Sequence, residues 1–290
     1  MPPVPDFRAR LRCGPPLVLD AAMGTDLLAR GARLPAPLWS AQALLDAPEL
    51  VEAIHRENAE AGADVLTIAS FRLHRRNLRG SSCSLSQAEL IATAVNLARR
   101  AARGEEKSLW IAGSLAPLED CYRPDRVPSE AEISSEHAEM AAALAAAGVD
   151  LILVETMNTV REAAAAARGA AATGLPAVVS CVTDGNGRLL SGEPVEDFAR
   201  ALLSLPSPPD ALGVNCVPAR SLAADLARLA AAAPGVPLAA YGNTFGDPVP
   251  PENDAALAAE WVRLGARLAG GCCGTTAAHT AAVARALQGK

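Results

Sequence analysis

The arrangement of apolar residues places the strongest limit on the fold. Eight short apolar runs recur along the chain, and stretches rich in alanine and other helix-forming residues separate them. Most runs are predominantly apolar and do not alternate with polar residues, which is typical of parallel strands covered by helices on both faces. The runs are residues 17–20, 65–69, 109–113, 151–155, 177–182, 211–215, 238–241 and 267–270. This alternation predicts an α/β protein with a (β/α)8 TIM barrel, and an open doubly wound sheet is the alternative.

Several local signals mark where the helices between these runs begin and end. A helix over residues 48–61 is predicted, with Asp46 as its cap and Pro48 tolerated in its first turn. Ser86 and Ser129 each precede a glutamate by three residues, which is the spacing of a capping box. Glycines stand where three helices should stop, at Gly62, Gly148 and Gly174.

Length and composition indicate one domain that acts on small molecules. The 290 residues suit a single barrel domain over residues 1–290, with its core at about 15–288. The formal net charge is −6 and there is no basic run, so nucleic acid is not expected as a partner. No apolar stretch approaches the ~20 residues of a membrane span, and the first 13 residues lack a signal-peptide core. We therefore expect a cytoplasmic protein, a monomer or small homo-oligomer, with no membrane partner.

Two sets of residues are not expected to bind a ligand. Arg72, Arg75, Arg76 and Arg79 cluster around His74, and a solvated loop or helix face is favoured over a polyanion site. The four histidines are interpreted as surface or capping residues and not as metal ligands: His55, His74, His137 and His279.

Three of the seven cysteines share a context that suits a metal. Cys216 follows the sixth run, and Cys272 and Cys273 follow the eighth run inside Gly-Gly-Cys-Cys-Gly. In a barrel, both strands end on the same rim, where the active sites of such barrels are built. Three thiolates favour Zn²⁺ and leave one tetrahedral position open, as in catalytic zinc sites. The alternative is three unrelated buried cysteines.

The other four cysteines have no such context. Cys181 is interpreted as core of the fifth strand, and Cys13, Cys83 and Cys121 as loop residues.

Polar residues at other strand ends are candidates for substrate binding. Asp20 and Glu155 both end apolar runs, so we expect both to point into the rim and to hold a substrate ammonium; each could instead cap a helix or pair with an arginine. Backbone amides near Gly24–Thr25 could bind a carboxylate at a helix N-terminus. Asn243 could occupy the open metal position or make ordinary turn hydrogen bonds, and Asn215 could orient the site.

These motifs resemble the homocysteine S-methyltransferase family over about residues 19–282. The matching segments are 19–25 (Leu-Asp-Ala-Ala-Met-Gly-Thr), 37–41, 48–50, His55, 61–64, 148–156, 213–216 (Gly-Val-Asn-Cys) and 270–275 (Gly-Gly-Cys-Cys-Gly-Thr). The resemblance implies a zinc-dependent barrel that binds homocysteine through its sulfur and methylates it to methionine. It also places amino-acid binding on Asp20 and Glu155, and substrate contacts on Met23, Gly24, Thr25 and Phe71.

The methyl donor is less closely defined. Trp39-Ser40 looks more like the branch that uses S-methylmethionine than the one that uses betaine. Ala21 stands where the family often has Gly, Phe71 where that branch often has Tyr, and residues 241–246 depart from the common Pro-Asn pattern.

A sulfonium donor is cationic, and aromatic faces bind such cations. Trp39, Phe71, Tyr241 and Phe245 lie in predicted rim loops or strand ends, where core or loop packing is the alternative role. The other hypotheses are a betaine- or corrinoid-dependent methyltransferase, a selenocysteine methyltransferase, or a zinc-binding thiol sensor without catalysis.

Overall fold

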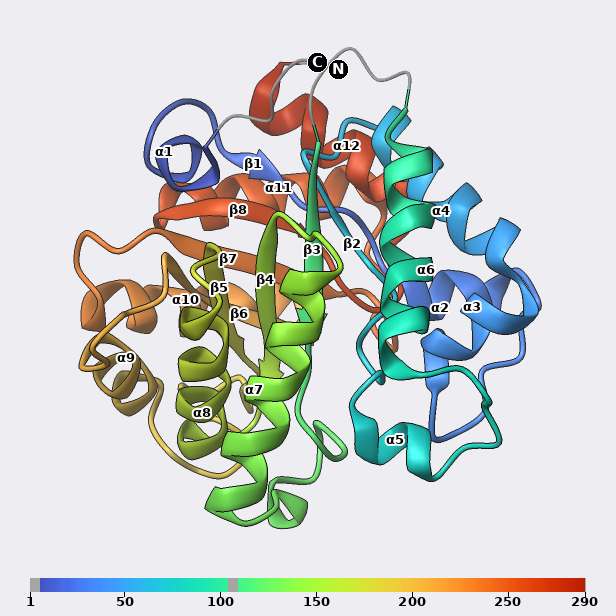
Figure 1. The fold of residues 1–290 in the computed structure, drawn as a ribbon. Coiled ribbons are helices and arrows are strands. Elements are labelled where there is room, and N and C mark those ends of the chain that lie inside the picture. Colours follow the sequence, from blue (N-terminus) through green and yellow to red (C-terminus); the bar gives the residue numbers. More distant parts are fainter. Residues whose placement is uncertain (1–5, 104–108, 290) are drawn as a thin grey trace.

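The computed structural model describes residues 6–103 and 109–289, which form a barrel of parallel strands (Figure 1). The strands are β1 (Leu17–Val18), β2 (Val65–Thr67), β3 (Trp110–Leu115), β4 (Leu151–Met157), β5 (Ala177–Cys181), β6 (Ala211–Pro218), β7 (Leu238–Asn243) and β8 (Ala266–Gly271). Their order in the sheet is β1-β8-β7-β6-β5-β4-β3-β2. A parallel bridge between Leu19 and Val65 brings β1 beside β2 and nearly closes the sheet. The predicted (β/α)8 barrel is confirmed, and the open sheet is excluded.

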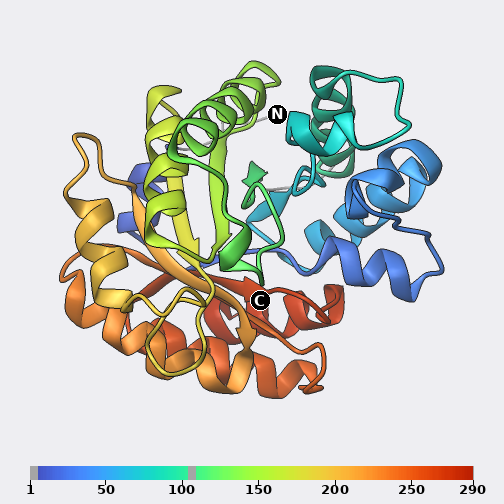
Figure 2. The ribbon, with the colours of Figure 1, turned by 90° about the horizontal axis from the view of Figure 1, so that it is seen from below.

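Eight helices surround the strands, and Figure 2 shows them following one another around the ring in sequence order. They are α4 (Pro48–Glu60), α6 (Gln87–Ala101), α7 (Glu130–Ala146), α8 (Val160–Ala172), α9 (Val195–Leu203), α10 (Ala219–Ala232), α11 (Pro251–Arg263) and α12 (Ala277–Gln288). Shorter segments are α1 (Phe7–Arg12), α2 (Met23–Ala29), η1 (Trp39–Gln42), α3 (Ala43–Asp46), α5 (Arg75–Arg79) and η2 (Pro124–Arg126). None of the helices in the described ranges is long and apolar enough to cross a membrane.

The helix signals were correct with one exception. Ser86 and Ser129 both form complete capping boxes. The predicted stop glycines have left-handed backbone, with φ of +101° at Gly62, +85° at Gly148 and +76° at Gly174. Asp46 is not the cap of α4, because it closes the preceding helix α3 and its carboxylate accepts a hydrogen bond from Gln42.

The core has two layers. An inner cluster fills the barrel, with Leu153, Val178 and Leu268 among its fully packed members, and a larger cluster lies between strands and helices. Phe7 and Leu11 of α1 belong to the inner cluster, and Phe7 packs edge-on against Trp110 at the start of β3. Because Trp110 is the first residue of β3, α1 closes the end of the barrel at which the strands begin, opposite to their carboxyl-terminal ends.

The histidines were wrongly assigned to the surface. All four are buried, because each belongs to a tertiary arrangement that the local sequence does not reveal. His74 and His137 pack edge to face, and His137 lies 3.2 Å from the Glu162 carboxylate. The expected capping role is present at two of them: the His279 side chain completes the capping box of α12, and His74 is the N-cap residue of α5 without a side-chain capping bond.

Candidate active site and metal centre

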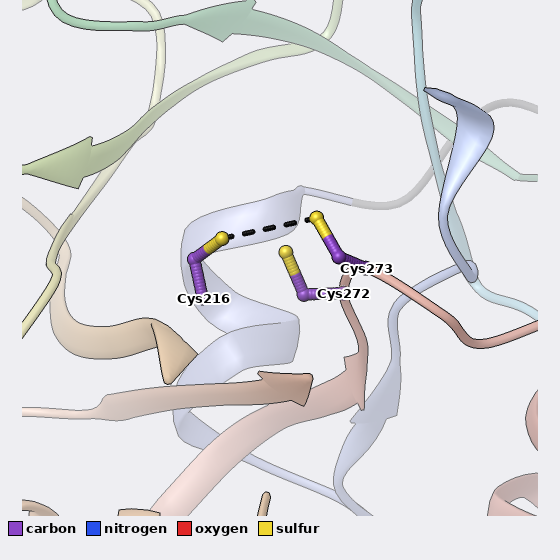
Figure 3. Close-up of side chains that lie close together, drawn as sticks. All are labelled: Cys216, Cys272 and Cys273. Atoms are coloured by element: carbon purple, nitrogen blue, oxygen red, sulfur yellow. Dashed lines mark hydrogen bonds between the residues drawn. The ribbon is translucent and has the colours of Figure 1, made fainter. Parts of the chain in front are cut away.

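Three cysteines from two strand ends meet at the carboxyl-terminal rim of the barrel. Cys216 lies near the end of β6, and Cys272 and Cys273 directly follow β8. Their sulfurs all lie within 4.8 Å of one another, and the sulfurs of Cys216 and Cys273 are 3.9 Å apart. Figure 3 shows the three side chains pointing toward a common centre. The convergence expected from the barrel is present.

An unusual backbone conformation turns Cys216 toward that centre. Its φ is +57°, and the pairing register of β6 shifts between Asn215 and Pro218. Strand β4 has a matching irregularity, where Thr156 has a φ of +61°. Such conformations cost roughly 1–3 kcal/mol each and persist only where the surrounding structure enforces them.

Asn215 supplies part of that enforcement. Its side-chain oxygen accepts the Thr156 backbone N–H at 2.9 Å, and its amide donates to the Thr156 hydroxyl at 3.0 Å. Asn215 is fully buried, so these bonds form away from solvent. One side chain of β6 thus fixes the bulge of β4.

The turn that carries Cys272 and Cys273 depends on Gly274. This residue has a φ of +87°, and a Cβ there would lie 2.5 Å from the backbone nitrogen of Phe245. The close approach lets the amides of Thr244 and Phe245 donate to the Cys273 carbonyl at 2.8 and 3.1 Å. The Gly274 amide donates to the hydroxyl of Thr25, which ties the turn to α2. Any side chain at position 274 would disrupt this turn.

The sulfur geometry fits a tetrahedral thiolate-bound metal. A Zn–S length of about 2.3 Å implies sulfurs ~3.8 Å apart at the tetrahedral angle, close to the 3.9 Å between Cys216 and Cys273. Soft thiolate ligands select metals of the zinc and copper(I) type over magnesium or calcium. The three sulfurs are therefore spaced so that they could hold one metal ion.

The pKa values of the three cysteines are also consistent with a cation at this position. Hydrogen bonds from the thiols of Cys272 and Cys273, and then from Tyr122 and Asn243, hold the pKa of Cys216 well below its ordinary range, although burial opposes this. The pKa values of Cys272 and Cys273 are raised, chiefly by their hydrogen bonds to Cys216. The hydrogen bonds among the three sulfurs thus oppose ionisation of all three thiols together, and a bound cation would favour it.

The cluster lies in a cavity of about 760 Å³. The predicted site residues on its wall are Asp20, Met23, Gly24, Thr25, Phe71, Glu155, Cys216, Cys272 and Cys273. Asn215 lies behind the wall, and the Asn243 amide donates to the Cys216 sulfur at 3.6 Å. Trp39 and Tyr241 also line the cavity, whereas Phe245 is 71% exposed on the rim outside it.

Two buried carboxylates stand on the cavity wall. Asp20 accepts hydrogen bonds from the backbone N–H and the hydroxyl of Thr67 at 2.7 and 2.9 Å, and Glu155 accepts one from Ser114 at 2.5 Å. Burial raises the pKa of Asp20 to about 8, with a smaller contribution from Glu155. Burial likewise raises the pKa of Glu155 to about 7, and the Cys216 sulfur adds to the effect. Burial thus favours the neutral form of both acids, and a cation bound against this wall would favour the ionised form.

The segment between β3 and α7 adds residues that the sequence did not single out. The hydroxyl of Tyr122 lies 3.1 Å from the Cys216 sulfur, and Cys121, interpreted as an ordinary loop residue, is buried in the cavity wall. Buried partners hold the segment in place: Glu162 accepts the Leu118 amide, and Asn158 donates to the Cys121 carbonyl. Only a general indication of this segment comes from the sequence: every loop that follows a barrel strand is a candidate for the active site.

Comparisons with known proteins agree with this geometry. The family model described as homocysteine S-methyltransferase matches residues 17–287. Homocysteine S-methyltransferase from Escherichia coli (strain K12) is 33% identical over 92% of this chain and 94% of its own length, and homocysteine S-methyltransferase 4 from Zea mays is 30% identical over 93% and 89%.

Solved structures of a relative match over almost the whole fold. The metallated form of the homocysteine methyltransferase MmuM from Escherichia coli superposes with a TM-score of 0.82 at 33% identity, covering 96% of this chain and 98% of that chain. Its oxidized form gives 0.84 over the same shares. The chain belongs to the homocysteine S-methyltransferase family of enzymes.

Proposed function

We propose that this protein is a zinc-dependent methyltransferase that moves a methyl group from a sulfonium donor, S-methylmethionine, to the thiol of homocysteine, giving methionine. One observation carries the proposal: three convergent sulfurs and two buried carboxylates share one cavity. Homocysteine presents a thiol and an ammonium group, which these two features complement. The names of the relatives support homocysteine as the acceptor.

Cys216, Cys272 and Cys273 would hold the zinc ion and leave one tetrahedral position for the substrate sulfur. When bound, zinc supplies a Lewis acid that keeps a coordinated thiol in its thiolate form at neutral pH. Asp20 and Glu155 would hold the substrate ammonium, whose positive charge favours the ionised form of both acids. The N-terminal amides of α2, which begins at Met23 after an alanine cap, are available for the substrate carboxylate.

The methyl group passes directly from one sulfur to the other, so no general base has to remove a proton from carbon. The homocysteine thiolate forms a new S–C bond to the donor methyl group, and the donor sulfur keeps the electron pair of the bond that breaks. The sulfonium charge and the thiolate charge disappear together, and the thiol proton leaves on binding. The faces of Trp39, Phe71 and Tyr241 would hold the donor cation by cation–π attraction.

Metal analysis combined with a panel of donors tests the proposal. We expect about one zinc per chain, and methionine formation from homocysteine with S-methylmethionine ahead of S-adenosylmethionine, betaine and dimethylsulfoniopropionate. Cys216→Ser and Cys273→Ser should lose both zinc and activity, whereas Cys13→Ser, at an exposed cysteine, should retain both. Bound zinc without methionine from any donor would refute the proposed activity.

We further propose that the protein acts in the cytoplasm on small molecules, as a monomer or small homo-oligomer. Free cysteines support the reducing compartment, because all seven are unpaired in the structure. Gel filtration and cell fractionation test these two points.

A further inference from the structure

The proposed mechanism leaves the arginine cluster unused, and its members differ in their surroundings. Arg79 is exposed and lies outside the active-site cavity. Arg75 forms an ion pair with Glu139, and Arg76 forms ion pairs with Glu119 and Glu136. Arg72 instead lines the active-site cavity. Among residues 6–103 and 109–289, no carboxylate forms an ion pair with Arg72.

Arg72 is held firmly although its charge is unmatched. Its Nη1 donates to the Glu119 backbone carbonyl at 2.8 Å, and its guanidinium carbon lies 5.5 Å from the centre of the Phe71 ring. The Glu119 carboxylate is already paired with Arg76. Arg72 is half-buried and fixed in place, so a bound anion would meet a positioned guanidinium that has no carboxylate partner.

A second guanidinium reaches the cavity from the β3–α7 segment. Arg126 of η2 lines the cavity, while its neighbour Arg123 pairs with Asp125. Within the described chain, Arg126 likewise has no ion-pair partner. Arg126 is exposed and Arg72 is half-buried, whereas Asp20, Glu155 and Cys216 are buried. The two arginines therefore lie nearer to solvent than the acids and the cysteine do.

We propose that Arg72 and Arg126 bind the carboxylate of the methyl donor and so select donors that carry one. The proposal rests on the proposed function. Homocysteine has its sulfur at the cysteines and its ammonium at Asp20 and Glu155, so the donor must approach its thiolate from the mouth. A carboxylate held by guanidiniums there aims the opposite, methyl-bearing end of the donor inward, and the paired charges give directional hydrogen bonds.

The test compares a donor that has a carboxylate with one that lacks it. Steady-state kinetics are measured with S-methylmethionine and with trimethylsulfonium for Arg72→Gln, Arg126→Gln and Arg72→Lys. Arg79→Gln is the matched control, because Arg79 is an exposed arginine of α5 outside the cavity.

We expect the KM for S-methylmethionine to rise about 10-fold or more in Arg72→Gln, which corresponds to loss of a charged hydrogen bond, and less in Arg72→Lys. The KM for homocysteine, the zinc content and kcat/KM with trimethylsulfonium should stay near the wild-type values. Equal losses with both donors, or a rise in the KM for homocysteine instead, would overturn the proposal.

A binding measurement separates this proposal from the proposed function. S-methylmethionine is titrated calorimetrically into the zinc-loaded protein, which needs no turnover. If the wild type binds it and Arg72→Gln binds it about 10-fold more weakly, the subsite stands even if no donor gives methionine. Equal affinities, or no binding by the wild type, would overturn it.

Discussion

Replacement of Glu155 by glutamine tests the proposal that this residue binds the ammonium group of an amino acid. The side chain keeps its size, and the Ser114 hydroxyl that now donates to the carboxylate at 2.5 Å can donate to the amide oxygen. The charge, and with it the attraction for an ammonium group, is removed. A charged hydrogen bond contributes about 1.5–3 kcal/mol, so the affinity for a bound amino acid should fall by about 10- to 150-fold.

The pH profile gives a second, independent signature. Asp20 and Glu155 have pKa values raised to about 8 and about 7, so part of the pair is protonated at neutral pH. Because the ammonium binds only the ionised acids, affinity should tighten as pH rises through 7 to 8 and weaken below. In Glu155→Gln, Asp20 loses a neighbouring negative charge, so its pKa falls and the midpoint of the profile moves to lower pH.

Methionine is a suitable ligand for this measurement, because it has no thiol whose own ionisation would add to the pH dependence of binding. Its dissociation constant is measured by calorimetry across the pH range for the wild type, Glu155→Gln and a control, Glu60→Gln, at an exposed glutamate of α4. If Glu155→Gln binds methionine as tightly as the wild type with the same pH profile, the assignment of Glu155 to the ammonium is wrong.

Three further predictions concern stability. Asn215→Ala leaves the buried Thr156 amide without its acceptor, so unfolding free energy should fall by about 1–3 kcal/mol in urea titrations, and competition with a chelator should show weaker metal binding. Asp254 is fully buried, and burial raises its pKa to about 6 from 3.8; its contribution to stability is therefore present at low pH and lost as pH rises through 6. Asp254→Asn should gain up to about 3 kcal/mol relative to the wild type between pH 4 and pH 8, and parallel profiles of unfolding free energy would contradict this. Ser129→Ala removes the capping box with Glu132 and should cost about 1 kcal/mol by thermal unfolding, whereas Ser207→Ala, at an exposed loop serine, should not.

The fold was predictable because its signals are local and repeated. Most strand runs are predominantly apolar without alternation, and the capping boxes at Ser86 and Ser129 depend only on residues three positions apart. The convergence of Cys216 with Cys272 and Cys273 was predictable from topology alone, since parallel strands in a barrel end on one rim.

The remaining features arise from contacts that no local pattern encodes. Tyr122 reaches the Cys216 sulfur only because buried partners hold the β3–α7 segment over the cavity. His74 and His137 are buried because they pack on each other, although their neighbours in the sequence are charged. Asp46 failed as a cap because a short preceding helix uses it.

Asn215 shows how the two halves of the site are kept in register. Homocysteine has a fixed number of bonds between its sulfur and its nitrogen, so a site that binds both must hold its sulfur ligands and its carboxylate at a fixed separation. Asn215 directly precedes Cys216 on β6, and its side chain binds Thr156, which directly follows Glu155 on β4. The bulges at Thr156 and Cys216 would relax separately without this link, since each has an unfavourable positive φ. Under the proposed function, this buried amide, which lies away from the cavity wall, would set the separation between the cysteine cluster and Glu155 that binding of the acceptor requires.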